Sequence, residues 1–161
     1  MKKIMEMLQH MKAKNEKKDN KGFSLVELII VIAIMAILVG IVGTQVLPYI
    51  NKSKLEKDRQ IVSSYSTAAV SAYSMVAGEI SALPSDGIDV YTGGYTSGDK
   101  KILADKIQEL AGSANPKDNL KSSEAAGASD ITITYDETNH KVTATVKGAS
   151  GATKLSVVST M

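Results

Sequence analysis

The sequence predicts an α+β fold in which a long N-terminal helix packs on a C-terminal antiparallel sheet of about three strands. Three observations favour this fold. Residues 28–50 are uncharged, and most of them are Ile, Val, Leu, Ala or Met. Residues 51–80 then show an amphipathic pattern with the period of a helix. Near the end of the chain apolar and polar residues alternate, which is typical of half-buried strands.

Composition and charge exclude several kinds of site. The 161 residues contain no cysteine, so a disulfide, a cysteine-based metal site and a thiol nucleophile are excluded. The net charge is +2, but residues 1–22 hold seven lysines and three acidic residues, whereas residues 23–161 hold 12 basic and 14 acidic residues. The basic character therefore belongs to the N-terminus, and we expect no specific binding of nucleic acid.

The lysine-rich residues 1–22 precede the apolar run and carry more positive charge than the segment just after it. By the positive-inside rule the N-terminus stays in the cytoplasm and the C-terminal half crosses the membrane. Two interpretations of this segment stay open: translation could start at Met11, or four apolar residues could form one face of a short helix on the membrane surface. These residues are Ile4, Met7, Leu8 and Met11.

The apolar run 28–50 is long enough to cross a membrane, because about 20 residues at a rise of about 1.5 Å span a hydrocarbon core of about 30 Å. A secretory signal peptide has a shorter apolar core and a small-residue cleavage site after it, and residues 39–44 offer no Ala-x-Ala. A plain single-pass anchor leaves Glu27 unexplained. An ionised carboxylate at the bilayer centre costs about 2.5–3.5 kcal/mol, so such groups usually have a partner.

A short motif at the start of the apolar run accounts for this glutamate. Residues 21–28 read KGFSLVEL and resemble the type IV prepilin cleavage and methylation motif. The resemblance implies a pilin-like fold, and it implies that a prepilin peptidase/methyltransferase cuts after Gly22 and methylates the new N-terminal amine of Phe23. Three segments follow from it. They are a leader peptide, 1–22, a transmembrane and filament-core helix, 23–50, and an extracellular head domain, 51–161.

The resemblance also implies a role for Glu27 in assembly. Cleavage creates an α-amino group on Phe23, four residues before Glu27. The amine of one subunit can neutralise Glu27 of its neighbour in a homo-oligomeric helical filament. That pair relieves the burial penalty of both charges and sets the axial register between subunits.

The apolar helix also contains residues that weaken a helix. The family commonly has a proline near the twenty-second mature position, and in this chain Gly40, Gly43 and Pro48 occupy this part of the helix. Proline removes a helical hydrogen bond and glycine lowers helix propensity. We expect a kink or a stretch that melts during filament packing within 40–48, with a simple kink tolerated by lipid as the alternative.

The head is predicted to begin with an amphipathic helix that continues the apolar one and ends at the turn-forming residues 83–87. The charged residues near its start are expected to form a solvated face. These are Lys52, Lys54, Lys57, Asp58 and Arg59. The opposite stripe should face a core. It comprises Leu55, Ile61, Val62, Tyr65, Ala68, Ala69, Ala72, Val76 and Ile80.

A second helix and the sheet follow. Residues 101–110 have helical spacing and stop before Gly112. Three strands are predicted, with a hairpin turn between the first two. The strands cover 131–135, 142–146 and 154–158, and the turn covers 136–140.

The sequence offers no catalytic pattern. His140, in the predicted hairpin turn, is the only histidine after residue 22, which excludes a histidine-based triad and a multi-histidine metal site. A Gly-x-Ser-x-Gly elbow, a P-loop and a dinucleotide motif are missing. Asp86, Asp89 and Asp99 could ligate calcium, but their spacing matches no calcium loop and turn formation explains them better. We therefore expect no enzyme, no cofactor and no metal site.

The leading interpretation is a structural subunit of a type IV pilus. The resemblance implies a precursor in the cytoplasmic membrane, which a pilus assembly platform builds into an extracellular filament for adhesion, motility, aggregation or DNA uptake. Two alternatives remain. One is a pseudopilin of a type II secretion or competence system, because the motif is shared. The other is a single-pass membrane-anchored binding domain that never polymerises, which would keep its leader and tolerate Glu27→Ala.

Overall fold

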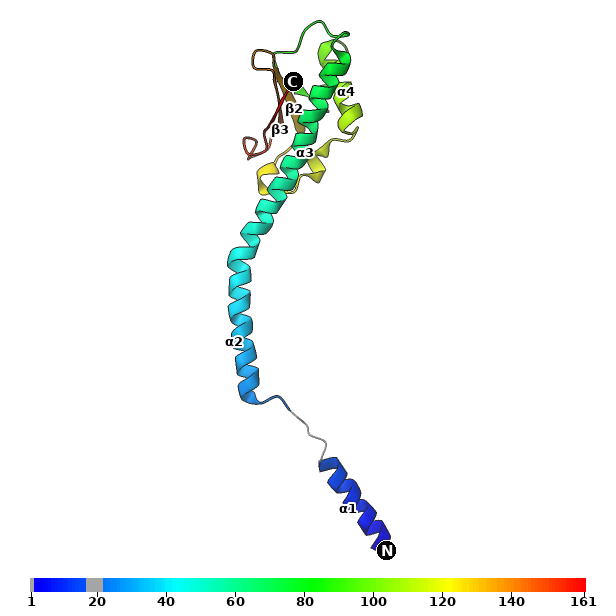
Figure 1. The fold of residues 1–161 in the computed structure, drawn as a ribbon, viewed down its shortest axis with the longest axis vertical. Coiled ribbons are helices and arrows are strands. Elements are labelled where there is room, and N and C mark those ends of the chain that lie inside the picture. Colours follow the sequence, from blue (N-terminus) through cyan, green and yellow to red (C-terminus); the bar gives the residue numbers. More distant parts are fainter. Residues whose placement is uncertain (1, 17–21) are drawn as a thin grey trace. The chain divides into compact units, whose positions relative to one another are not determined.

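The fold is that of a computed structural model, which describes residues 2–16 and 22–161. The chain divides into two compact units, Met1–Thr44 and Gln45–Met161. The first unit contains helix α1, Lys2–Glu16, and helix α2, Leu25–Ile41. Helical structure is continuous over Leu25–Val76 and passes through a π-helical segment, Val42–Val46, into helix α3, Leu47–Val76 (Figure 1).

The π-helical segment lies where the sequence places helix-weakening residues. The Thr44 hydroxyl donates hydrogen bonds to the carbonyl oxygens of Gly40, at 3.1 Å, and Ile41, at 3.3 Å. A side chain that donates hydrogen bonds to backbone carbonyl oxygens of the preceding turn competes with the backbone N–H groups. It therefore favours a local departure from regular α-helical bonding. Pro48 follows at the start of α3, and because it has no N–H it offers no hydrogen bond to the carbonyl groups of the preceding helical turn. A kink or a melting stretch within 40–48 stays a prediction.

The second unit is an α+β head, as predicted. Its antiparallel sheet has four strands in the order β1-β2-β3-β4, rather than about three. The strands are β1, Ile88–Asp89, β2, Asp130–Asp136, β3, Lys141–Lys147, and β4, Val157–Thr160. Strands β2 and β3 pair from Asp130↔Lys147 to Asp136↔Lys141, which confirms the predicted hairpin.

Two details of the sheet differ from the prediction. Strand β1 has only two residues, too few to show an alternating pattern in the sequence. The predicted strand at 154–158 is wrong at its start, because the Lys154 and Leu155 backbone nitrogens bond to the Gly151 carbonyl in a turn. Leu155 is still fully buried, so the turn contributes to the core without belonging to the strand.

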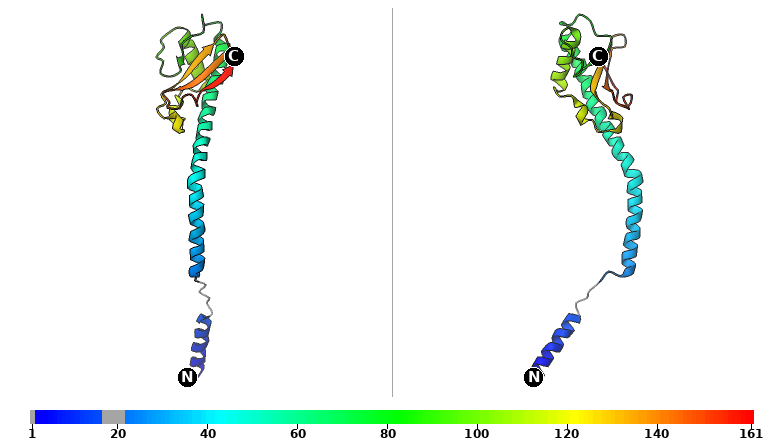
Figure 2. Two further views of the ribbon diagram at one scale, coloured as in Figure 1. Left: turned by 90° about the vertical axis from the view of Figure 1, so that its left-hand side faces the viewer. Right: turned by 180° about the vertical axis from the view of Figure 1, so that it is seen from behind.

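Helix α3 is the central element of the head. Strands β3 and β4 cover one side of it, and helix α4, Asp99–Ala111, covers the other (Figures 1 and 2). Ala69 and Ala72 are fully buried, and their short side chains let other elements pack closely against this helix. The predicted second helix, 101–110, is confirmed as α4. The large core residues that have no exposed surface are Val62, Leu103, Ile107, Ile88, Ile131, Ile133, Val142, Val146 and Leu155.

The predicted apolar stripe of α3 is largely confirmed, although the helix ends at Val76, before the predicted break at 83–87. Six of its nine residues are buried and the other three are partly buried against the core. The buried six are Val62, Tyr65, Ala68, Ala69, Ala72 and Val76.

The predicted solvated face of α3 is wrong at Asp58, which has no exposed surface. Its carboxylate accepts hydrogen bonds from the backbone nitrogens of Lys121, at 3.0 Å, and Ser122, at 2.7 Å, and from the Ser122 hydroxyl at 2.5 Å. Asp58 therefore anchors a distant loop to the start of the head helix. Arg59 remains at the surface and pairs with Glu56 at 3.6 Å.

Candidate functional site

The N-terminus of α2 is built by a reciprocal cap. Ser24 is the N-cap residue, and its hydroxyl oxygen accepts a hydrogen bond from the Val26 backbone nitrogen at 3.3 Å. In return the Ser24 backbone nitrogen donates to Glu27 Oε2 at 2.8 Å. These contacts satisfy backbone donors that a helix start leaves without partners. The negative charge of Glu27 in the first turn also suits the helix dipole. The sequence S-x-x-E therefore fixes the start of the helix at Leu25.

The predicted cleavage site lies directly before this cap. Residues 22–24 have no regular secondary structure, and Phe23 is 84% exposed. A Cβ added to Gly22 would meet no atom within 4 Å, and Gly22 is not among the glycines with positive φ. This chain therefore does not itself require glycine at position 22, and any such requirement comes from the protein that binds the site. Lys21, the first residue of the motif, lies outside the described residues.

The structure brings Glu27 to Ser24 within one chain. No hydrogen bond between Glu27 and Phe23 occurs in the described part of the first unit. The pair predicted between Glu27 and the amine of a neighbouring subunit therefore stays a prediction. A carboxylate has two oxygens and about four lone-pair sites, so the bond to Ser24 leaves it able to accept further donors.

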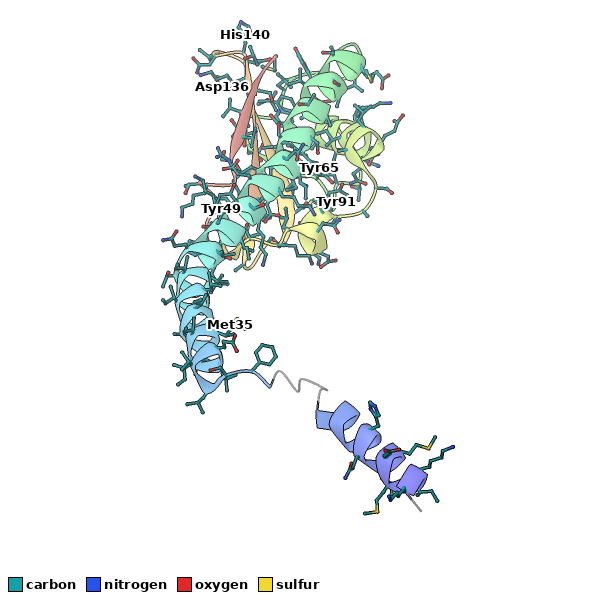
Figure 3. All side chains as sticks on the ribbon, turned by 60° about the horizontal axis from the view of Figure 1, so that its bottom comes forward. Met35, Tyr49, Tyr65, Tyr91, Asp136 and His140 are labelled. Atoms are coloured by element: carbon teal, nitrogen blue, oxygen red, sulfur yellow. The ribbon has the colours of Figure 1, made fainter. Side chains whose placement is uncertain are left out.

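Helix α2 presents apolar surface on all sides. None of its residues is buried, and Met35, labelled in Figure 3, is 59% exposed. The mean hydropathy reaches 3.2 over 18 residues, and Glu27 is the only charged residue in 23–50. Transfer of each large apolar side chain out of water is favourable by about 1.5–3 kcal/mol of free energy. The continuous helix Leu25–Val76 is, by its length and composition, able to cross a membrane.

Gly40 and Gly43 leave small gaps on the surface of this helical stretch. A Cβ added at either glycine would meet no atom within 4 Å, so neither is needed for packing within the chain. Both nevertheless lower the helix propensity, Gly40 just before the π-helical segment and Gly43 within it. Their predicted part in flexibility, with that of Pro48, stays a prediction.

The three aspartates considered for calcium each bond to different groups of the protein. Lys100 donates to Asp86 at 2.5 Å, the Thr132 hydroxyl donates to Asp89 at 2.7 Å, and Asp99 accepts from the backbone nitrogens of Ser81 and Ala82 at 3.1 Å. Within 2–16 and 22–161 there is no group of three or more His, Cys, Asp or Glu residues that could hold a metal ion.

The charge partners of two of these aspartates shift their pKa values. The hydrogen bond from Lys100 lowers the pKa of Asp86. Partial burial raises the pKa of Asp89, but the hydrogen bonds from Lys147 and Thr132 outweigh it, so the pKa lies below its usual range. These shifts match structural ion pairs at the surface of the head.

Sequence reasoning missed a polar cluster inside the head. Tyr65 and Tyr91 share a hydrogen bond of 2.6 Å between their hydroxyl oxygens, with their rings edge to face and 6.2 Å apart (Figure 3). Burial raises the pKa of both tyrosines. Asp130 is buried and accepts from the Tyr91 nitrogen at 3.1 Å and from the Thr92 nitrogen and hydroxyl at 2.7 Å. The cluster fixes residues 90–92 against α3.

A family model described as the prokaryotic N-terminal methylation motif matches residues 17–43. The match includes the predicted cleavage site, the Ser24 cap, Glu27 and helix α2. Neither the comparison with curated proteins nor the comparison with solved structures finds a match. The motif implies processing by a prepilin peptidase and association with a membrane, and it belongs to structural rather than catalytic proteins. The chain therefore carries the type IV prepilin signature at its N-terminus.

Proposed function

We propose that this chain is the precursor of a structural subunit of a type IV pilus, not an enzyme. Cleavage between Gly22 and Phe23 removes the leader 1–22, and Phe23 becomes the methylated N-terminal residue. Helix 23–50 then enters the filament core and the head 51–161 covers its surface. The observation that carries the proposal is the processing motif directly before an apolar helix that buries none of its own residues.

Apolar burial alone does not explain why such helices would assemble. Lipid tails are as apolar as leucine, so transfer of α2 from the membrane to a bundle of neighbouring helices gains little from the hydrophobic effect. Close packing and polar pairs must therefore supply most of the free energy that favours association of the helices. Gly40 and Gly43, with open space around them, allow other helices to approach closely.

Glu27 supplies the polar pair. It can keep its hydrogen bond to the Ser24 nitrogen and still accept the Phe23 amine of the adjacent subunit with its remaining lone pairs. A charge pair of this kind, in apolar surroundings, is strongly favoured over either charge alone. Because only one axial stagger brings the two groups together, the pair also sets the register of the filament.

The proposal places the precursor in the cytoplasmic membrane and the mature subunit outside the cell, after an assembly platform extracts it from the bilayer. The absence of cysteine from the chain offers a direct test. Thr138→Cys puts one thiol on the exposed hairpin turn, whereas Ser66→Cys puts a thiol of similar size at a fully buried position. Intact cells expressing each variant are treated with a membrane-impermeant fluorescent maleimide and imaged.

Each image has a definite meaning. Fluorescent filaments from Thr138→Cys, with no label on Ser66→Cys, support the pilus subunit. Label confined to the cell outline indicates an anchored head that forms no long filament, as expected for a pseudopilin or a non-polymerising domain. No label on intact Thr138→Cys cells would contradict export of the head.

A further inference from the structure

Helix α1 has an apolar face that no other described element covers. Ile4, Met7 and Leu8 follow the spacing i, i+3, i+4, which places them on one side of the helix. They are between 57% and 72% exposed. Lys2, Glu6 and Gln9 fall on the opposite side by the same periodicity.

The charge of this segment is suited to one kind of surface. Residues 1–22 hold seven lysines and three acidic residues, and Lys2 and Lys3 project into solvent from the first turn of α1. An apolar stripe on a helix within a lysine-rich segment is the pattern of helices that lie in the headgroup region of anionic membranes. In helices of this kind the lysines pair with lipid phosphates while the apolar stripe contacts the upper acyl chains.

The chain itself holds α1 close to a bilayer. Only residues 17–24 separate it from α2, and eight residues reach at most about 29 Å when fully extended. Once α2 spans the membrane, α1 therefore samples a small volume next to the headgroups. An effective concentration in the millimolar range makes even weak binding to lipid sufficient.

We infer that α1 binds the cytoplasmic surface of a membrane rich in anionic phospholipid, with Ile4, Met7 and Leu8 inserted at the boundary between the headgroups and the acyl chains. This inference rests on the proposed function, because it requires α2 to be anchored in the bilayer. The bound helix holds the leader along the membrane and keeps the Gly22–Phe23 bond at the interface, where a membrane peptidase works. Cleavage then releases α1 with the leader.

The chain contains no tryptophan, so a single tryptophan reports its own surroundings. We would reconstitute the full-length precursor as three variants, Leu8→Trp, Gln9→Trp and Met35→Trp, into nanodiscs of phosphatidylcholine with and without phosphatidylglycerol. Quenching by brominated lipid then measures the contact of each position with acyl chains. Gln9 is the matched control on the polar side of α1, and Met35 reports insertion of α2.

The inference predicts strong quenching of Leu8→Trp in anionic discs and weak quenching of Gln9→Trp. At high salt the quenching of Leu8→Trp should disappear. Adding Lys2→Gln and Lys3→Gln should lower the ratio of bound to free helix about fivefold for each lysine. Met35→Trp should be quenched in every disc.

Four results would overturn the inference. Equal weak quenching of Leu8→Trp and Gln9→Trp, with Met35→Trp strongly quenched, refutes it while anchoring stands. An unquenched Met35→Trp refutes the anchoring as well, and with it the proposed function. If the quenching of Leu8→Trp disappears in discs that hold one precursor each, the apolar face of α1 binds a second copy of the chain and not the lipid. The N-terminus of the precursor can also be determined in cells that lack the peptidase. If that precursor begins at Met11, it lacks Ile4, Met7 and Leu8, and the apolar face does not exist in the protein.

Discussion

The carboxylate of Glu27 accepts a hydrogen bond of 2.8 Å from the backbone nitrogen of Ser24. Glu27 is also the only charged residue of 23–50. One side chain therefore caps the helix and also carries the charge that burial in the proposed filament would have to neutralise. The cap fixes the start of the helix at Leu25 and leaves the Gly22–Phe23 bond in irregular, exposed chain just before it. In the proposed function, processing and assembly depend on adjacent features of one short segment, which separate substitutions can distinguish.

Gly22→Val should block processing without affecting the fold. A Cβ at position 22 meets no atom of the chain within 4 Å, so the head and α2 should form normally while a peptidase subsite shaped for glycine rejects the side chain. Immunoblots of whole cells should show precursor in place of mature protein. Gly78→Val is the matched control, since a Cβ at Gly78 also meets open space. Mature Gly22→Val at the level of the natural sequence would contradict cleavage after Gly22.

Glu27→Gln should be processed normally but should fail to enter filaments, because it keeps the capping oxygen and loses the charge. Ser24→Ala is the complementary variant, which keeps the charge and loses a cap contribution of about 1 kcal/mol. The ratio of sheared to membrane-bound protein measures assembly. We expect a loss of most surface filaments for Glu27→Gln and a small effect for Ser24→Ala. The charge pair is wrong if Glu27→Gln alone forms normal filaments.

Asp58→Ala should destabilise the head by about 3 kcal/mol, because it leaves the backbone nitrogens of Lys121 and Ser122 without their acceptor. Glu56→Ala, two residues earlier on the exposed face, removes only a surface pair with Arg59 and should change stability by less than about 1 kcal/mol. Urea unfolding of both variants in detergent micelles, followed by near-UV circular dichroism, compares them. Equal stability of the two variants would show that Asp58 is not an anchor.

The head should lose stability above about pH 10, the pKa of a tyrosine in the unfolded chain. Burial raises the pKa of Tyr135, whose hydroxyl donates to the Ala69 carbonyl at 3.0 Å. Between the unfolded and the folded pKa only the unfolded state releases this proton, so stability falls as pH rises, by at most about 1.4 kcal/mol per pH unit. Tyr135→Phe should be less stable at neutral pH but should show a shallower alkaline slope. An unchanged slope would mean that Tyr135 ionises without unfolding.

The sequence predicted the features that local signals encode. The apolar helix, the KGFSLVEL motif, the β2–β3 hairpin and helix α4 each appear within a short window of residues. Strand β1 was missed because two residues carry no period. The predicted third strand began too early because turn bonding to Gly151 shifts β4 to Val157.

The buried polar contacts were missed for another reason. Asp58 falls on the apolar stripe, three residues after Leu55 and four before Val62, and this position is a signal of burial that its charge obscured. Its partners Lys121 and Ser122 are more than 60 residues away in the chain. Tyr65 and Tyr91 likewise meet only in the fold. Sequence periodicity cannot pair such distant groups.

The most direct test of the proposed function is the mass of the N-terminal peptide of protein sheared from the cell surface. The proposal predicts a chain that begins with N-methylated Phe23, in the sheared fraction and in large amount. The contradicting result is a chain that keeps its leader and is found only in the membrane fraction.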